Sequence, residues 1–339
     1  MTWPRRDGTN APRSFLFIEP MTPKRFLVVR DSAPDGALHG AVVAMGNFDG
    51  VHRGHQAVIA AAQERARTLG KPAAVLTFEP HPRAFFAGQE PLFRLTDEAA
   101  KLRLLASTGL DGAIVLTFDA ALAGLTAEEF VRDILVGRFA ISGAVIGFNF
   151  HFGKNRAGSP DFLTAQGRKF GFTVDVVPPF ELNGRSVSSE PIRAALAAGR
   201  VDDAAELLGF PWFVSGEVIH GDKRGRELGF PTANLRLDMA CGLRHGVYAV
   251  RVACGGRRYD GVANFGRRPM FDSGAVLLEV FLFDFAGDLY GQRIDTAFIA
   301  WIREEKMFAS VDELIRAIND DADKARAALK RAGDVFPPI

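Results

Sequence analysis

The sequence has few cysteines and no long apolar run, and each absence excludes a class of protein. Two cysteines, Cys241 and Cys254, are too few for a disulfide framework or a four-cysteine zinc site, so we expect a reducing, cytoplasmic setting. No apolar run reaches the roughly 18–20 residues that a membrane helix needs. The short run Phe15–Ile18 ends at Glu19-Pro20, which does not fit a secretory signal.

Net charge is also nearly absent. The chain has 41 Lys and Arg residues against 40 Asp and Glu residues, a formal net charge of +1. This balance gives no basic surface for nucleic acid or an anionic membrane, so we expect neither as a partner. Residues 1–30 hold six basic and two acidic residues, so the remainder of the chain has a net charge of −3. Any site for an anion must therefore depend on local groups and not on a global positive field.

The length of 339 residues indicates two domains at roughly 100–200 residues each. An apolar fraction of 47% supplies enough material for two folded cores. Residues 1–20 are rich in Pro, Arg and polar residues without an amphipathic period, so we expect a disordered tail. Met21 is a second candidate for the natural start of translation.

Residues 40–180 show an α/β pattern. Short apolar runs recur about every thirty residues with amphipathic helical segments between them, which is the spacing of βα units in a parallel sheet. The runs are Ala41–Met45, Ala73–Phe78, Ala113–Phe118, Ala144–Gly147 and Thr173–Val177. We therefore predict an open, doubly wound sheet.

The pattern changes after residue 185. Two short helices are predicted at Pro191–Ala198 and Val201–Leu208, and a domain boundary at Phe210-Pro211. The closely spaced strands that follow predict a small antiparallel barrel. They are Phe213–His220, Val247–Ala253, Tyr259–Asn264, Val276–Asp284 and Arg293–Ile299. A final helix begins at Ser310.

The segment Gly46–His55 (GNFDGVHRGH) follows the first of these runs and leads into a helix. Such a turn lies where ligands bind in an open α/β sheet, and glycines with a helix N-terminus favour phosphate. His52 and His55 can face one point across the first helical turn, where they would stabilise charge on phosphoryl oxygens. The residues alone leave three alternatives open: zinc ligands, plain turn glycines, or structural histidines.

The segment Gly221–Asn234 is the second candidate site. Glycines and basic residues precede Thr232 and Asn234, whose oxygens suit Mg²⁺, but the residues alone favour an ordinary charged hairpin. Glu279 interrupts the otherwise apolar strand Val276–Phe283. It lies either at an exposed edge or in a site, and partial burial would raise its pKa and suit a general base.

Several strings together resemble the bacterial bifunctional riboflavin kinase/FAD synthetase family. They are Gly46–His55, Thr77–Pro82 (TFEPHP), Gly147–Gly153 (GFNFHFG), Ser188–Arg193 (SSEPIR) and Gly229–Asn234 (GFPTAN). The resemblance runs from about residue 40 to 330. It implies a Rossmann-like nucleotidyltransferase domain and a six-stranded antiparallel Greek-key β-barrel with a terminal helix. The implied parts are an adenylyltransferase domain at 21–185, a helical linker that completes its site at 186–209, and a riboflavin kinase domain at 210–339.

The resemblance also implies the reactions. Riboflavin would be phosphorylated by ATP to FMN, and FMN would then be adenylylated by a second ATP to FAD and pyrophosphate, with Mg²⁺ as cofactor. Partners would be riboflavin, FMN and ATP, and self-association is left open. The residues implied for the adenylyltransferase are Gly46, Asn47, Phe48, Asp49, His52, His55, Asn149, Ser188, Ser189 and Arg193. Those implied for ATP at the kinase are Gly221, Lys223, Gly229, Pro231, Thr232 and Asn234, the last two as Mg²⁺ ligands. Glu279 is implied as the base, and Glu279, Arg303 and Phe308 as flavin contacts.

One departure from the family pattern favours an alternative. Glu190 stands where the family has Thr, and a carboxylate near ATP would repel it unless it points away or binds through Mg²⁺. The runner-up hypothesis is therefore a riboflavin kinase with an impaired or altered nucleotidyltransferase domain. The structural interpretation of Glu190 is a favourable negative charge in the first turn of a helix.

Overall fold

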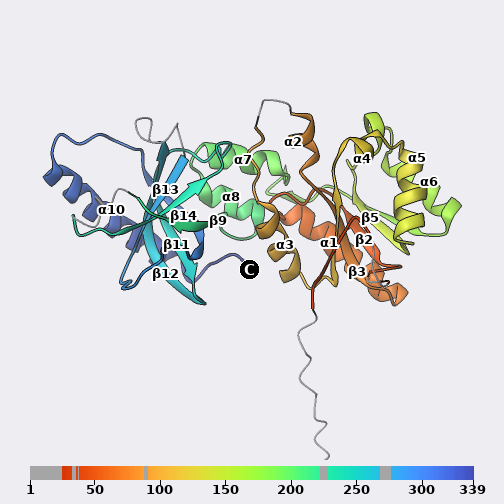
Figure 1. Cartoon of the computed structure of the whole chain (residues 1–339), viewed down its shortest axis with the longest axis horizontal. Coiled ribbons are helices and arrows are strands. Elements are labelled where there is room, and N and C mark those ends of the chain that lie inside the picture. Colours follow the sequence, from red (N-terminus) through yellow and green to blue (C-terminus); the bar gives the residue numbers. More distant parts are fainter. Residues whose placement is uncertain (1–24, 33–35, 37, 88–90, 222–227, 268–275) are drawn as a thin grey trace, which may run out of the picture.

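The computed structural model describes residues 25–32, 36, 38–87, 91–221, 228–267 and 276–339, which form an α/β domain and a β-barrel side by side (Figure 1). Helices α7 (Ser189–Ala197) and α8 (Val201–Leu208) lie between them. Lys223 and the predicted tail at 1–20 lie outside the described residues. In the described ranges, no helix combines the length and apolar content needed to cross a membrane.

Six parallel strands form the sheet of the α/β domain, in the order β1-β4-β3-β2-β5-β6. They are β1 (Leu27–Arg30), β2 (Val42–Met45), β3 (Ala73–Glu79), β4 (Gly112–Thr117), β5 (Gly143–Gly147) and β6 (Thr173–Val177). After β2 the chain adds β3 and β4 on one side, then crosses to add β5 and β6 on the other. The strand order therefore reverses between β2 and β5, and ligands of such sheets bind at the carboxyl ends of strands at this point.

Both faces of the sheet are covered. Val42 and Ala44 face one core and Val43 and Met45 the other, as the two-residue period of a strand requires. Helices α1 (Arg53–Leu69) and α3 (Glu98–Ser107) cover the first face, and a π-helix (Phe130–Arg138) with α6 (Pro160–Phe170) covers the second. Shorter elements are α2 (Pro82–Phe86), α4 (Ala120–Gly124), α5 (Ala127–Glu129), a 3₁₀ turn (Lys154–Arg156), β7 (Glu181–Leu182) and β8 (Arg185–Ser186). The predicted doubly wound sheet is confirmed.

The second domain is a closed barrel of six antiparallel strands in the order β10-β13-β12-β11-β14-β9. The strands are β9 (Phe213–Ile219), β10 (Thr232–Leu237), β11 (Gly246–Cys254), β12 (Arg257–Arg267), β13 (Val276–Leu282) and β14 (Arg293–Arg303). Helix α10 (Val311–Ala332) packs Ala325, Ala328 and Leu329 against the outside of the barrel. The predicted barrel with a terminal helix is confirmed.

Strand β10 differs from what the residue pattern predicts. Thr232 and Asn234 were expected in a donor-rich loop or hairpin, but they lie on a strand of the barrel. Ala233 and Leu235 point into the hydrophobic core, while the alternate positions carry the polar side chains. The pattern fails here because a strand that lines a polar site lacks the apolar content by which strands are recognised.

The two domains share one continuous hydrophobic core through α7 and α8. Trp212, at the start of the barrel, is buried and donates its indole N–H to the Leu95 carbonyl of the α/β domain at 2.8 Å. On α3, Arg103 makes two hydrogen bonds to the Asp295 carboxylate of β14, at 2.6 and 2.7 Å. The orientation of the domains is therefore fixed by apolar packing and directed polar contacts together.

Candidate functional site

The turn after β2 lies at the point where the strand order reverses. His52 caps the N-terminus of α1, and its Nδ1 accepts a hydrogen bond from the His55 backbone N–H at 3.2 Å. The two imidazole rings stack with centroids 3.6 Å apart, and Phe48 packs beside His55. Because Nδ1 of His52 is an acceptor, its Nε2 carries the proton and is available as a donor to an anion.

Burial keeps these histidines neutral. Desolvation lowers the pKa of His52 to about 4, although the nearby Asp49 carboxylate opposes the shift. Burial likewise lowers the pKa of His55, with the proximity of His52 and Lys101 adding to the effect. The Nδ1 atom of His55 is buried and has no hydrogen-bond partner among the described residues. The pair therefore offers N–H donors to a ligand without adding a full positive charge.

Helix α7 brings its N-terminus to this turn from a distant part of the sequence. The Ser189 hydroxyl donates to the Asp49 carbonyl at 3.1 Å, and the Arg193 guanidinium forms an ion pair with the Asp49 carboxylate. Asp49 also accepts hydrogen bonds from the backbone N–H groups of Leu95 and Thr96 at 2.9 and 3.1 Å. Asp49 thus fixes the turn and orients Arg193. The sequence placed both residues at the site but did not predict this supporting role of Asp49.

The other predicted residues of this site lie around the same edge of the sheet. Asn149 is exposed in the loop that follows β5, the strand paired with β2. Ser188 is the N-cap residue of α7. The Glu190 side chain is 72% exposed and lies 3.4 Å from Arg193 and 3.6 Å from Arg83. Its charge therefore lies in the first turn of a helix beside two cations, as the structural interpretation expects.

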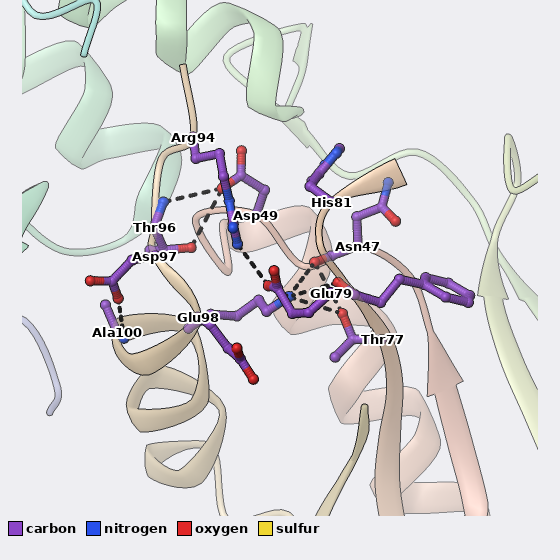
Figure 2. A network of polar contacts seen from close by, with 12 residues as sticks. Asn47, Asp49, Thr77, Glu79, His81, Arg94, Thr96, Asp97, Glu98 and Ala100 are labelled. Atoms are coloured by element: carbon purple, nitrogen blue, oxygen red, sulfur yellow. Dashed lines mark hydrogen bonds and ion pairs between the residues drawn. The ribbon is translucent and has the colours of Figure 1, made fainter. Parts of the chain in front are cut away.

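A buried ion-pair network under the turn was missed from the sequence. The Lys101 ammonium, 1% exposed, lies 2.6 Å from the Glu79 carboxylate at the end of β3, and Arg94 binds the same carboxylate at 2.7 Å. Figure 2 shows Glu79 and Thr77 beside Asn47, with Arg94 reaching Glu79. Burial would raise the pKa of Glu79, but the two cations hold it below its ordinary value. The sequence indicates this network only through the position of Lys101, which shares the apolar face of α3 with Leu104 and Leu105.

A cavity of about 830 Å³ between the barrel strands and helix α10 gathers most of the second set of predicted residues. Those that line it are Gly221, Pro231, Thr232, Asn234, Glu279, Arg303 and Phe308. Gly229 lies between two lining residues, Leu228 and Phe230, and has a φ of +87°, which favours glycine. The predicted residues of the barrel that the structure describes therefore converge on one cavity.

Strand pairing places the oxygen-bearing side chains of the cavity together. Asn234 on β10 and Asn264 on β12 both pair with Glu279 on β13, which is half-buried. Thr232 lies two residues before Asn234 and so shares its face of β10. Hydroxyl, amide and carboxylate oxygens are the hard ligands that suit Mg²⁺.

The zinc alternative concerned the histidine pair of the α/β domain, His52 and His55. The described residues contain no group of three or more His, Cys, Asp or Glu side chains able to bind a metal, so this pair has no further zinc ligands among them.

Arg303 projects into the cavity from the end of β14 and is held from behind. Its Nε and one terminal nitrogen bind the buried Asp321 carboxylate of α10, at 2.8 and 2.7 Å. The guanidinium lies 5.6 Å from the centroid of the Phe308 ring. Asp321 was not predicted, because its burial depends on how α10 packs against the barrel.

Comparisons with known proteins match each domain separately. A family model described as FAD synthetase matches residues 35–191, and one described as riboflavin kinase matches residues 208–329. Together these matches include every candidate site residue except Arg193.

Relatives named for both activities match most of this chain. The bifunctional riboflavin kinase/FMN adenylyltransferase of Pseudomonas fluorescens is 45% identical over 289 residues, covering 85% of this chain and 93% of its own. That of Haemophilus influenzae is 41% identical over 291 residues, covering 86% and 94%. A crystal structure of a macrolide-efflux protein from Streptococcus pneumoniae is similar with a TM-score of 0.77 and 32% identity, over 88% of this chain and 98% of that one.

The depressed pKa of His52 predicts that stability falls on mild acidification. Between about pH 6.5 and pH 4, unfolded His52 binds a proton that the folded protein excludes, so the free energy of unfolding falls as pH falls. The loss from this histidine should reach about 2 kcal/mol by pH 5. His52→Asn keeps a capping acceptor but cannot titrate, so urea unfolding between about pH 7 and pH 5 should show a smaller loss of stability.

The matched control is His151→Asn, at an exposed histidine of the same domain. It should retain the pH dependence of the wild type. An unchanged pH dependence in His52→Asn would show that His52 binds protons as readily in the folded protein as in the unfolded chain.

Proposed function

The chain belongs to the bifunctional riboflavin kinase/FMN adenylyltransferase family, and we propose that it makes FAD in two ATP-dependent steps at two separate sites. The barrel transfers the terminal phosphoryl group of ATP to riboflavin, which gives FMN and ADP. The α/β domain transfers the adenylyl group of a second ATP to FMN, which gives FAD and pyrophosphate. The observation that carries this proposal is that one chain combines a turn with two buried, stacked histidines at the strand-order reversal and a cavity lined by Thr232, Asn234 and Glu279.

At the barrel, Glu279 acts as the general base. A ribityl hydroxyl of riboflavin must lose its proton as its oxygen attacks the terminal phosphorus, and a half-buried carboxylate beside Asn234 is suited to accept it. Thr232 and Asn234 would hold Mg²⁺, whose charge would screen the ATP phosphates. Gly221 and Gly229 allow backbone to approach the nucleotide, because neither has a side chain to intervene.

The flavin is proposed to lie against Arg303 and Phe308. The Asp321 carboxylate fixes the plane of the guanidinium, and the Phe308 ring lies beside it in the same cavity. A flat cation and an aromatic ring are both suited to stacking on the planar ring system of a flavin.

Adenylyl transfer needs no strong base, because the FMN phosphate is already an anionic nucleophile. An oxygen of that phosphate attacks the α-phosphorus of ATP, and the bond from the α-phosphorus to the bridging oxygen of pyrophosphate breaks. His52 and His55 donate N–H bonds to the triphosphate, while Asn149, Ser188 and Arg193 bind it from the other side of the turn. Gly46, Asn47 and Phe48 shape the turn against the nucleotide, and Asp49 holds Arg193 in place.

The impaired-transferase alternative is not favoured by the position of Glu190. Its side chain is mostly exposed and lies beside Arg83 and Arg193, so its charge is partly offset by cations. For the domain limits we propose 21–185, 186–209 and 210–339, with α7 in the linker completing the adenylyltransferase site. We also place the protein in the cytoplasm, where Cys241 and Cys254, both free thiols, would stay reduced.

The proposal is tested by incubating the whole chain with riboflavin, ATP and Mg²⁺ and separating the flavins by chromatography. Both FMN and FAD should form. The absence of FMN would refute the kinase assignment, and FMN without FAD would support the alternative of an impaired transferase domain.

Substitutions in the two sites should have reciprocal effects. The double variant His52→Ala/His55→Ala should lose FAD formation by at least about 100-fold while FMN formation is kept, because the triphosphate contacts that it removes lie in the α/β domain and the barrel site is unaltered. Glu279→Gln should lose FMN formation from riboflavin but keep FAD formation when FMN is supplied. Initial rates of each half-reaction measure both effects, and a parallel loss of both activities in either variant would disprove two independent sites.

Replacing Glu190 should not harm adenylyl transfer. Glu190→Thr removes an exposed carboxylate near the proposed phosphate site, so the rate of FAD formation should stay within about 3-fold of the wild type or rise. Steady-state kinetics with FMN and ATP measure this, and Glu128→Thr at another exposed carboxylate of the α/β domain is the control. A large loss confined to Glu190→Thr would reveal a direct role for this carboxylate.

A further inference from the structure

The turn that holds the candidate adenylyltransferase residues is strained. Phe48 and Val51 have φ values of +51° and +42°, and Gly50 has +81°. Positive φ is rare for residues with side chains and especially unfavourable for a β-branched residue such as Val51. Strained backbone of this kind persists only where the surrounding structure over-determines it. The contacts that hold the turn should therefore matter to its function.

Most of these contacts come from one segment, Arg94–Lys101. The Thr96 hydroxyl accepts a hydrogen bond from the Gly50 N–H at 3.1 Å, and the backbone N–H groups of Leu95 and Thr96 donate to the Asp49 carboxylate. Figure 2 shows the side chains of Thr96 and Asp49 pointing toward one another. These contacts hold the outer part of the turn.

Lys101 reaches the base of the turn from beneath. Besides Glu79, its ammonium lies 3.5 Å from the Asn47 carbonyl, 3.3 Å from the Thr77 hydroxyl and 3.4 Å from the Phe78 carbonyl. The Thr77 hydroxyl itself donates to the Asn47 carbonyl at 3.2 Å. One buried cation therefore joins the carboxyl ends of two neighbouring strands, β2 and β3.

We infer that Lys101 is a positioning residue for adenylyl transfer, which holds the strained turn and its histidines in the geometry that binds the triphosphate. The inference rests on the proposed function of the α/β domain. A role as counter-ion to Glu79 alone does not account for the geometry, because Arg94 already binds that carboxylate at 2.7 Å. Lys101 acts on the substrate through Asn47 and the turn, and it is not itself a catalytic residue.

The experiment compares FAD formation by Lys101→Met, Glu79→Gln and the double variant, each as the full chain. Lys101→Met should lower kcat for FAD formation by at least about 10-fold, because small misplacements of a site are costly in rate. FMN formation by the barrel of the same preparation should stay within about 2-fold and serves as an internal measure of the folded barrel domain. The matched control is Lys169→Met, which removes an exposed Lys–Glu pair on the same domain and should keep both activities.

The double variant separates positioning from charge balance. If Lys101 positions the turn, Lys101→Met/Glu79→Gln stays slow, because the Asn47 carbonyl and the Thr77 hydroxyl still lack their cation. Recovery of the double variant to near the wild-type rate would overturn the inference and leave Lys101 as a counter-ion. Unchanged FAD formation in Lys101→Met would also overturn it.

A second variant covers the case in which Lys101→Met unfolds the α/β domain. Thr77→Val is close in shape but removes the hydroxyl that bridges Lys101 and Asn47, and it should lower FAD formation without altering FMN formation. Normal FAD formation in Thr77→Val would refute the inference in that case. A wild-type chain that makes no FAD would instead refute the proposed function itself, before any variant is compared.

Discussion

The conformation of the turn between β2 and α1 is the constraint on which the α/β site depends. Each positive φ at a residue with a side chain costs about 1–3 kcal/mol, and the turn contains two, Phe48 and Val51. Local sequence cannot supply this free energy, so it must come from tertiary contacts. Segment Arg94–Lys101 binds the turn from one side and Ser189 and Arg193 of α7 from another. The site therefore exists only once elements far apart in the sequence have packed together.

Local pairing of charges accounts for how a chain with almost no net charge could hold the two triphosphates of the proposed reactions. In the α/β domain the cations Lys101 and Arg94 share Glu79, and Arg193 is paired with Asp49, so little unbalanced charge is buried. The neutral imidazoles of His52 and His55 then provide N–H donors beside the proposed triphosphate site. In the barrel the polar groups are mostly oxygens, which suit the Mg²⁺ proposed to meet the phosphates there. The proposed α/β site would thus contact the triphosphate through N–H donors, whereas the proposed barrel site would contact it through a metal ion held by oxygens.

Much of this architecture could be predicted from the sequence, since apolar runs thirty residues apart and motifs such as GNFDGVHRGH are local signals. The missed features depend on tertiary burial. Lys101 and Asp321 occupy the buried faces of α3 and α10, but a sequence does not show which charged residue on a helix will meet a partner across the core. Strand β10 was missed because Thr232 and Asn234 replace the apolar residues by which a strand is recognised. In each case the local pattern is weakest at residues that build or support a site.

Helix α3 connects the two halves of the molecule. Lys101 faces the turn of the α/β domain, while Arg103, two residues further on, binds Asp295 and Ser215 of the barrel. The loop before α3 likewise holds the turn through Thr96 and accepts the Trp212 hydrogen bond through Leu95. Because a well-packed interior transmits displacement, a shift of the barrel that moves α3 must also alter the support of the strained turn. The residues that support the turn and those that dock the barrel therefore lie on the same short stretch of chain, Leu95–Arg103.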